Sequence, residues 1–143
     1  MFAPTAGEHV ALTPNRLLYV GGLTEIRGIR EMFQAVVRVR ARFPQLHLDL
    51  VGPIVDASLE PLVRQAWSEG WCRHLPWRAP EQLAPFCRGA GVGLVPYQPL
   101  PVHLEALPTK IFEYMAMGVP ILASDFPLWR DLIEHAGCGR MAE

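Results

Sequence analysis

The sequence predicts an α/β fold with a doubly wound parallel sheet of about six strands and helices on both faces. Short apolar segments rich in branched residues alternate with segments whose apolar residues recur at helical spacing. Several of the short segments are apolar throughout, which is typical of strands covered on both faces. Because strands and helices alternate along the chain, the strands are expected to run parallel.

The first predicted unit is a strand, a glycine turn and a helix. Met1–Asn15 is rich in proline, threonine, alanine and glycine without a period, so we expect a linker or loosely held arm there and a folded domain over 16–143. RLLYVGG, residues 16–22, is the first strand with its turn. One apolar face of the following helix is formed by Ile29, Met32, Phe33, Val36 and Val37.

The second unit repeats this order. Phe43 and Pro44 end the first helix, and LHLDLVG at 46–52 supplies the second strand. Ser58 is predicted to cap the next helix. The apolar stripe of that helix is formed by Leu59, Leu62, Val63, Ala66 and Trp67.

The third unit is a short strand at Cys72–Leu75 followed by a helix that begins at Pro80. Pro85 has to lie in the first turns of this helix or kink it. The residues expected to face inward are Leu83, Phe86 and Cys87. The remaining predicted elements are the strand GVGLVPY (91–97), the helix Thr109–Met117, the strand VPILASD (119–125), the helix Pro127–Ala136 ended by Gly137, and the strand CGRMAE (138–143).

The composition excludes several classes of function. The 13 basic and 14 acidic residues give a net charge of −1, which provides no general attraction to nucleic acid or to anionic membranes. No apolar run approaches the roughly 18 residues of a membrane span, and no signal segment opens the chain, so we expect a cytoplasmic protein. Cys72, Cys87 and Cys138 show no CxxC spacing, which favours free thiols over a metal site or a disulfide.

The first glycine turn, GGLTEIRG at 21–28, lies at the carboxyl end of a strand, where doubly wound sheets bind ligands. Gly21, Gly22 and Gly28 do not fit GxGxxG, and no acid ends the second strand, so a nicotinamide cofactor is disfavoured. A Walker loop is excluded because no GKS or GKT follows. The turn would allow an anion to approach backbone amides with Arg27 behind it, although glycine turns without a ligand are common.

The second turn contains the chain's single lysine, Lys110, beside 12 arginines. Pro108 and Thr109 open a helix whose free amides and positive end would face the same edge of the sheet, where Lys110 adds a charge that suits a diphosphate. A surface ion pair with Glu113, at i+3, is the alternative. Apolar residues on most sides of this helix favour the ligand, because a buried carboxylate needs partners such as sugar hydroxyls.

Glu105, Pro108, Lys110, Glu113 and the following YMAMGVPILASD resemble the donor-binding signature of family-4 retaining glycosyltransferases of the GT-B fold. Seven residues separate Glu105 from Glu113, as in the E-x7-E motif of that family. Elsewhere YVGG with RGI, GVGLVPY and GCGRM are similar to its first donor-domain turn and its fourth and sixth strands. The chain thus resembles the C-terminal nucleotide-sugar donor-binding domain of that family.

The resemblance implies roles for the matched residues. Glu113 would bond the ribose hydroxyls, and Glu105 would contact the transferred sugar. Arg27 matches the second member of the basic pair that binds the diphosphate. Gly22 stands where many relatives carry the first member, which shifts phosphate binding toward Arg27, Lys110 and the helix amides. The other residues assigned to the donor site are Gly21, Pro108, Thr109 and Ile111.

Three further residues allow two interpretations each. Trp77 and Arg78 follow the third strand where relatives often hold the base, but ordinary packing would explain a tryptophan equally well. His103, two residues before Glu105, either lines the sugar pocket or has no role in binding.

The resemblance also implies what surrounds the domain. Phe2-Ala3-Pro4 resembles the F-x-P element of the linker from an acceptor domain, and the sequence stops at Glu143 before the usual terminal helices. We therefore expect an excised donor domain, or one half of a split enzyme, whose partner is the missing N-terminal acceptor domain. The face that would contact the acceptor domain is expected to be apolar. Exposure of that face in the isolated chain predicts self-association.

The expected activity is transfer of a hexosyl group from a UDP- or GDP-sugar to an acceptor hydroxyl with retention, by an enzyme that is able to associate peripherally with a membrane. The isolated chain would bind the donor without transferring it. No metal and no cofactor are expected, because the sequence has no DxD motif. The alternatives are a non-enzymatic nucleotide-binding subunit that needs a partner chain, and a GT-B epimerase or phosphorylase.

Overall fold

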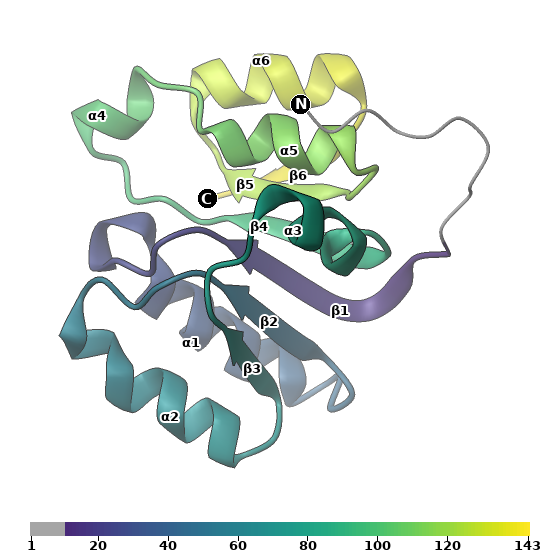
Figure 1. The fold of residues 1–143 in the computed structure, drawn as a ribbon. Coiled ribbons are helices and arrows are strands. Elements are labelled where there is room, and N and C mark those ends of the chain that lie inside the picture. Colours follow the sequence, from purple (N-terminus) through teal and green to yellow (C-terminus); the bar gives the residue numbers. More distant parts are fainter. Residues whose placement is uncertain (1–10) are drawn as a thin grey trace.

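The computed structural model describes residues 11–143 and confirms the predicted α/β class (Figure 1). One sheet contains six strands in the order β3-β2-β1-β4-β5-β6, and every neighbouring pair is parallel. The strands are β1 (Thr13–Val20), β2 (His47–Val51), β3 (Cys72–Leu75), β4 (Ala90–Val95), β5 (Ile121–Ser124) and β6 (Gly139–Ala142). The first strand begins before Arg16, and the expected arm up to residue 10, with Phe2-Ala3-Pro4, lies outside the described residues.

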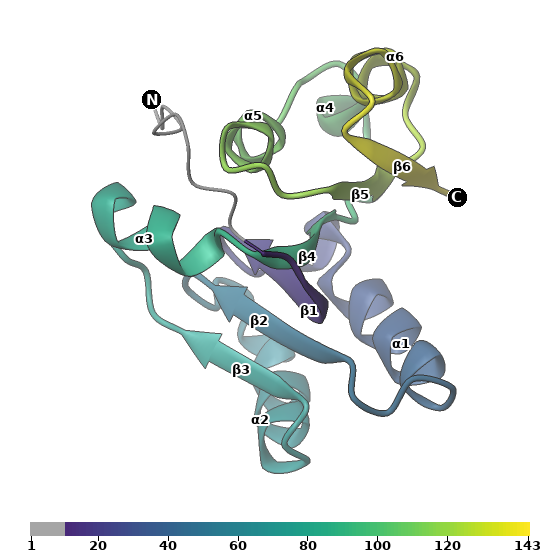
Figure 2. The same cartoon turned by 90° about the vertical axis from the view of Figure 1, so that its right-hand side faces the viewer.

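Helices cover both faces of the sheet, as predicted. The helices are α1 (Ile29–Arg40), α2 (Glu60–Ser68), α3 (Pro80–Cys87), α4 (Pro101–Leu104), α5 (Thr109–Ala116) and α6 (Pro127–Ala136), with short 3-10 turns η1 (Glu25–Arg27) and η2 (Ala57–Leu59). Figure 2 shows α1 and α2 on one side of the sheet and α3, α5 and α6 on the other. Each side has its own cluster of buried apolar side chains, so the sheet lies between two cores.

Three details of the predicted helices were wrong. Val37 and Trp67 were assigned to buried stripes but are 53% and 51% exposed, so only part of each stripe packs against the sheet. Ser58 caps no helix, since its hydroxyl donates to Glu25 Oε1 at 2.8 Å and the chain enters α2 through η2. The short helix α4 was not predicted, whereas Pro85 lies in the second turn of α3, in agreement with the prediction.

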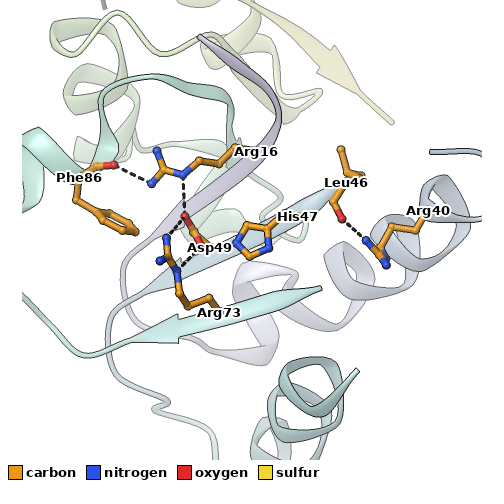
Figure 3. A network of polar contacts seen from close by, with 7 residues as sticks. All are labelled: Arg16, Arg40, Leu46, His47, Asp49, Arg73 and Phe86. Carbon is orange, nitrogen blue, oxygen red and sulfur yellow. Dashed lines mark hydrogen bonds and ion pairs between the residues drawn. The ribbon is translucent and has the colours of Figure 1, made fainter. Parts of the chain in front are cut away.

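A buried carboxylate ties together the three strands on one side of the switch point (Figure 3). Asp49 of β2 is fully buried and accepts hydrogen bonds from Arg16 of β1 at 2.7 Å, from Arg73 of β3 at 3.0 Å through two nitrogens, and from its neighbour His47 at 2.8 Å. Burial alone would raise the pKa of Asp49, but these bonds outweigh it and hold the pKa below its ordinary value. The network fixes the register of β1, β2 and β3.

The three cysteines are free, as predicted. Cys72 and Cys87 are buried, and burial raises the pKa of each thiol to about 12. Both therefore behave as small apolar groups of the core.

Candidate functional site

The order of the strands places a switch point between β1 and β4. The chain leaves β1 toward α1 on one face and leaves β4 toward α5 on the other, so the carboxyl ends of these two strands open a crevice. Both turns predicted to bind a ligand lie at this edge, because the first glycine turn follows β1 directly and α5 begins after the loop that follows β4.

Lys110 reaches from α5 to the first glycine turn. A Cβ atom added to Gly21 would lie 3.1 Å from Lys110 Nζ and 3.7 Å from Arg27 Nη1. Gly21 has a φ of 132°, a backbone conformation that other residues rarely adopt. The glycine therefore serves two purposes, because it permits the turn and it leaves room for two basic side chains to converge.

The amino group of Lys110 is enclosed by aromatic rings and lacks a polar partner. The residue is 5% exposed, and its Nζ forms no hydrogen bond with any of residues 11–143. Nζ lies 3.8 Å from the ring centroid of Tyr19 and 5.0 Å from that of Tyr97. Burial, and then the like charge of Arg27, holds the pKa of Lys110 well below its ordinary value, while Glu113 opposes this shift. The surface ion pair with Glu113 is therefore not what holds this side chain.

Arg27 forms the other side of the crevice. Its Nη1 donates to the carbonyl oxygen of Gly22 at 3.2 Å, and its guanidinium lies 5.7 Å from the ring centroid of Tyr97. A Cβ atom on Gly22 would lie 3.3 Å from Arg27 Nη1 and 3.1 Å from Val55. A larger residue at position 22 would thus have to displace Arg27 or Val55. Glycine at this position leaves the space that the Arg27 guanidinium occupies.

Tyr114 anchors α5 to the sheet. Its side chain is fully buried, and its hydroxyl accepts the backbone N–H of Val20 at 3.1 Å, at the carboxyl end of β1. The ring fits because Gly93 has no side chain, since a Cβ atom there would lie 2.7 Å from the ring. Tyr114 follows Lys110 by one helical turn on the same face, so this anchor also sets the position of Lys110.

The first turn of α5 presents its backbone to the crevice. Thr109 and Lys110 are its first two residues, and their amides have no carbonyl within the helix to bind. Pro108 precedes them and accepts the N–H of Ile111 at 3.1 Å. The Ile111 side chain is fully buried in the core. The amides of Thr109 and Lys110, at the start of the helix, are therefore the donors that an anion could bind.

The two acids of the E-x7-E spacing have different surroundings. Glu105 is exposed and Glu113 is half-buried, and neither carboxylate forms an ion pair with a residue of 11–143. A hydrogen bond from α6 holds the segment that carries Glu105. Nε1 of the fully buried Trp129 donates to the carbonyl oxygen of Ala106 at 2.6 Å. Both carboxylates remain available to a ligand.

The segment after β3 lies at the same edge of the sheet. Trp77 is 60% exposed, which argues against its being an ordinary packing residue. Arg78 is half-buried, and its Nε is enclosed without a hydrogen-bond partner in residues 11–143. His103 is buried against the Tyr97 ring and its Nδ1 pairs with the carbonyl of Gln98 at 2.7 Å, so it supports the loop after β4.

Other features of the described residues lie elsewhere. Residues 11–143 contain no cluster of three or more His, Cys, Asp or Glu side chains that would hold a metal ion. In the same range, each helix is too short or too polar to cross a bilayer. A cavity of about 660 Å³ near Gly118 and Gly137 lies at the amino ends of β5 and β6, opposite the crevice.

Sequence reasoning missed the aromatic residues that build the crevice. Tyr19, Tyr97, Tyr114 and Trp129 were not assigned to the site. Tyr114 carried a signal, since it follows Lys110 by four residues and therefore shares its helix face. The others reach the site from elements distant in the chain, and periodicity does not reveal such contacts.

Residues 14–143 match the model of the family described as "Glycosyl transferases group 1". This match includes both turns of the crevice and all six strands except the first residue of β1. No curated protein matches the chain.

Several solved structures share the fold. AviGT4, a glycosyltransferase involved in avilamycin A biosynthesis, gives a TM-score of 0.71 at 18% identity over 94% of this chain and 38% of its own. Alr3699/HepE from Anabaena in complex with UDP gives 0.69 at 20% identity over 89% of this chain and 34% of its own. The C-terminal domain of a glycosyl transferase group 1 family protein (LpcC) from Francisella tularensis gives 0.70 at 16% identity over 99% of this chain and 77% of its own. The chain thus spans less than two fifths of AviGT4 and HepE.

Proposed function

Because the chain belongs to the group 1 glycosyl transferases, we propose that it is the nucleotide-diphosphate-sugar binding half of a family-4 retaining glycosyltransferase of the GT-B fold. The complete enzyme moves a hexosyl group from a UDP- or GDP-sugar to an acceptor hydroxyl, and a separate acceptor domain completes the cleft. The chain by itself binds the donor without transferring the sugar.

One observation carries this proposal, namely the buried Nζ of Lys110 without a partner at the switch-point edge. Burial of a polar group without a hydrogen-bond partner costs free energy, and an oxygen of a diphosphate would supply the partner. Arg27 and the free amides of Thr109 and Lys110 lie around the same crevice. Donors fixed there would stabilise the charge that develops on the diphosphate when the sugar leaves.

The other residues receive roles from their positions. Glu113, one turn further along α5, binds the ribose hydroxyls, and Glu105 contacts the transferred sugar. Trp77 stacks on the base, supported by Arg78, since both follow β3 at the same edge. Gly21, Gly22 and Pro108 contribute backbone that lets the diphosphate come close.

Calorimetric titration of the chain with UDP and with GDP tests the proposal. We expect one of the two to bind, with the affinity unchanged by EDTA because the charge is met by amides and cations. Lys110→Met is expected to weaken binding at least about tenfold, the loss of one charge-assisted hydrogen bond. The matched control is Arg64→Met, which also removes one positive charge, from the exposed face of α2.

Two results would contradict the proposal. The first is absence of binding for both nucleotides, and the second is equal affinity of wild type and Lys110→Met. A transfer assay with the chain alone completes the test, because efficient turnover would show that no acceptor domain is needed.

A further inference from the structure

Lys110 lies where the diphosphate would bind under the proposed function, on which this inference rests. Its Nζ lies against the faces of Tyr19 and Tyr97, beside Gly21, and forms no hydrogen bond with residues 11–143. Arg27 Nη1 converges on the same glycine. An ammonium group here would be a buried cation without a hydrogen-bond acceptor and next to a second cation, which is an unfavourable arrangement.

Four ionisable groups face the Lys110 amine from the elements packed around it. Arg27 comes from η1, Glu113 from α5 itself, Tyr19 from β1 and Tyr97 from the loop after β4. The two aromatic faces and Glu113 favour the charged form. Burial and Arg27 disfavour it more strongly, and the pKa of Lys110 lies well below its ordinary value.

We propose that a nucleoside diphosphate entering this site converts Lys110 from a neutral amine to an ammonium group, so that binding is coupled to the uptake of one proton from solvent. No other bond forms or breaks. A neutral amine offers the phosphate oxygens at most two N–H donors and no charge, whereas an ammonium group offers three N–H donors and a positive charge. The ligand therefore binds the protonated form more tightly.

This coupling makes donor affinity sensitive to pH. Between the pKa of Lys110 in the free protein and its higher pKa in the complex, the dissociation constant rises about tenfold for each unit of pH. Burial raises the pKa of both Tyr19 and Tyr97, and a terminal phosphate, with a second pKa near 6, is already ionised at about pH 8.

The chain offers a direct measurement because Lys110 is its single lysine. Labelling with ¹³C,¹⁵N-lysine gives one lysine side chain, whose ε-carbon shift reports the charge of the amine. We expect its titration midpoint in the free protein to lie well below the ordinary value of about 10.4. Saturation with UDP is expected to raise the midpoint by at least about one unit. Equal midpoints near the ordinary value in both states would overturn the inference.

Calorimetry of UDP binding in two buffers with different heats of ionisation counts the protons. At a pH between the lysine midpoints of the free protein and of the UDP complex, we expect net proton uptake on binding, which approaches one proton per UDP when the midpoints lie about two units or more apart. Lys110→Arg is the control, since a guanidinium stays charged and is expected to bind with no uptake. If that variant does not fold, the titration of the wild-type lysine decides the matter.

The outcomes separate the inference from the function on which it rests. UDP binding without proton uptake would overturn the inference and leave the proposed function intact. No binding of UDP or GDP would overturn both.

Discussion

The hydroxyl of Tyr114 accepts the backbone N–H of Val20 at 3.1 Å. Val20 is the last residue of β1, and Tyr114 lies one turn after Lys110 on α5. This bond joins the strand that precedes the first glycine turn to the helix that carries the lysine. One side chain therefore fixes the two halves of the crevice relative to each other.

Tyr114→Phe is expected to lower the free energy of unfolding by about 1–3 kcal/mol, because it leaves the buried amide of Val20 without its acceptor. Denaturant unfolding measures the change. Tyr97→Phe is the matched control, since burial of the Tyr97 ring against His103 and Trp129 survives the substitution. An equal loss of unfolding free energy in both variants would show that the bond to Val20 does not contribute to stability as expected.

Asp49→Asn is expected to destabilise the fold by about 3 kcal/mol at neutral pH, since Arg16 and Arg73 would lose their buried partner. The pKa of Asp49 is lowered by folding, so its contribution to stability is complete above the unfolded value of about 3.9 and is lost as the pH falls from there through the lower pKa of the folded state. Unfolding at about pH 6 and about pH 3 checks this. We expect a smaller difference between variant and wild type at the lower pH, and a constant difference would contradict the account.

Glu113→Gln separates ribose binding from phosphate binding. If the carboxylate binds the ribose hydroxyls, the variant should lose roughly tenfold in affinity for UDP, the magnitude of one charged hydrogen bond. Affinity for inorganic pyrophosphate should stay the same or rise, because a negative charge near Lys110 is removed. Glu134→Gln is the control, as Glu134 lies near the cavity at the opposite edge. Equal losses for both ligands would place Glu113 at the phosphate.

Trp129→Phe is expected to loosen the segment that carries Glu105, since Phe keeps the ring but cannot donate to the carbonyl of Ala106. Amide hydrogen exchange should become faster across 104–108 while α6 remains protected. The control is Trp67→Phe, because Trp67 is 51% exposed and should leave exchange in that segment unchanged. Faster exchange throughout the molecule would mean that the variant only lowers global stability.

The fold was predictable because strands buried on both faces show as apolar runs. All six strands and the helices between them, apart from α4, followed from that alternation, and the ligand edge followed from the parallel sheet. Periodicity does not tell which side of an apolar stripe meets solvent, so Val37 and Trp67 were misplaced. That depends on how each helix is rotated against the sheet.

The residues of the candidate site were easier to name than their environment. The spacing of Lys110 and Glu113 allowed an ion pair, yet the lysine turns toward Tyr19 and Tyr97 on other elements. The partners of Asp49 come from three strands, and only their register brings them together. Contacts between elements distant in the chain leave no periodic trace in the sequence.

Gly93 and Tyr114 form a matched pair, because the ring occupies the space that any side chain at position 93 would fill. In the evolution of this fold the two positions should therefore change together. A homologue with alanine or serine at position 93 is expected to carry a smaller residue at position 114, and to satisfy the amide of the first strand with a different acceptor.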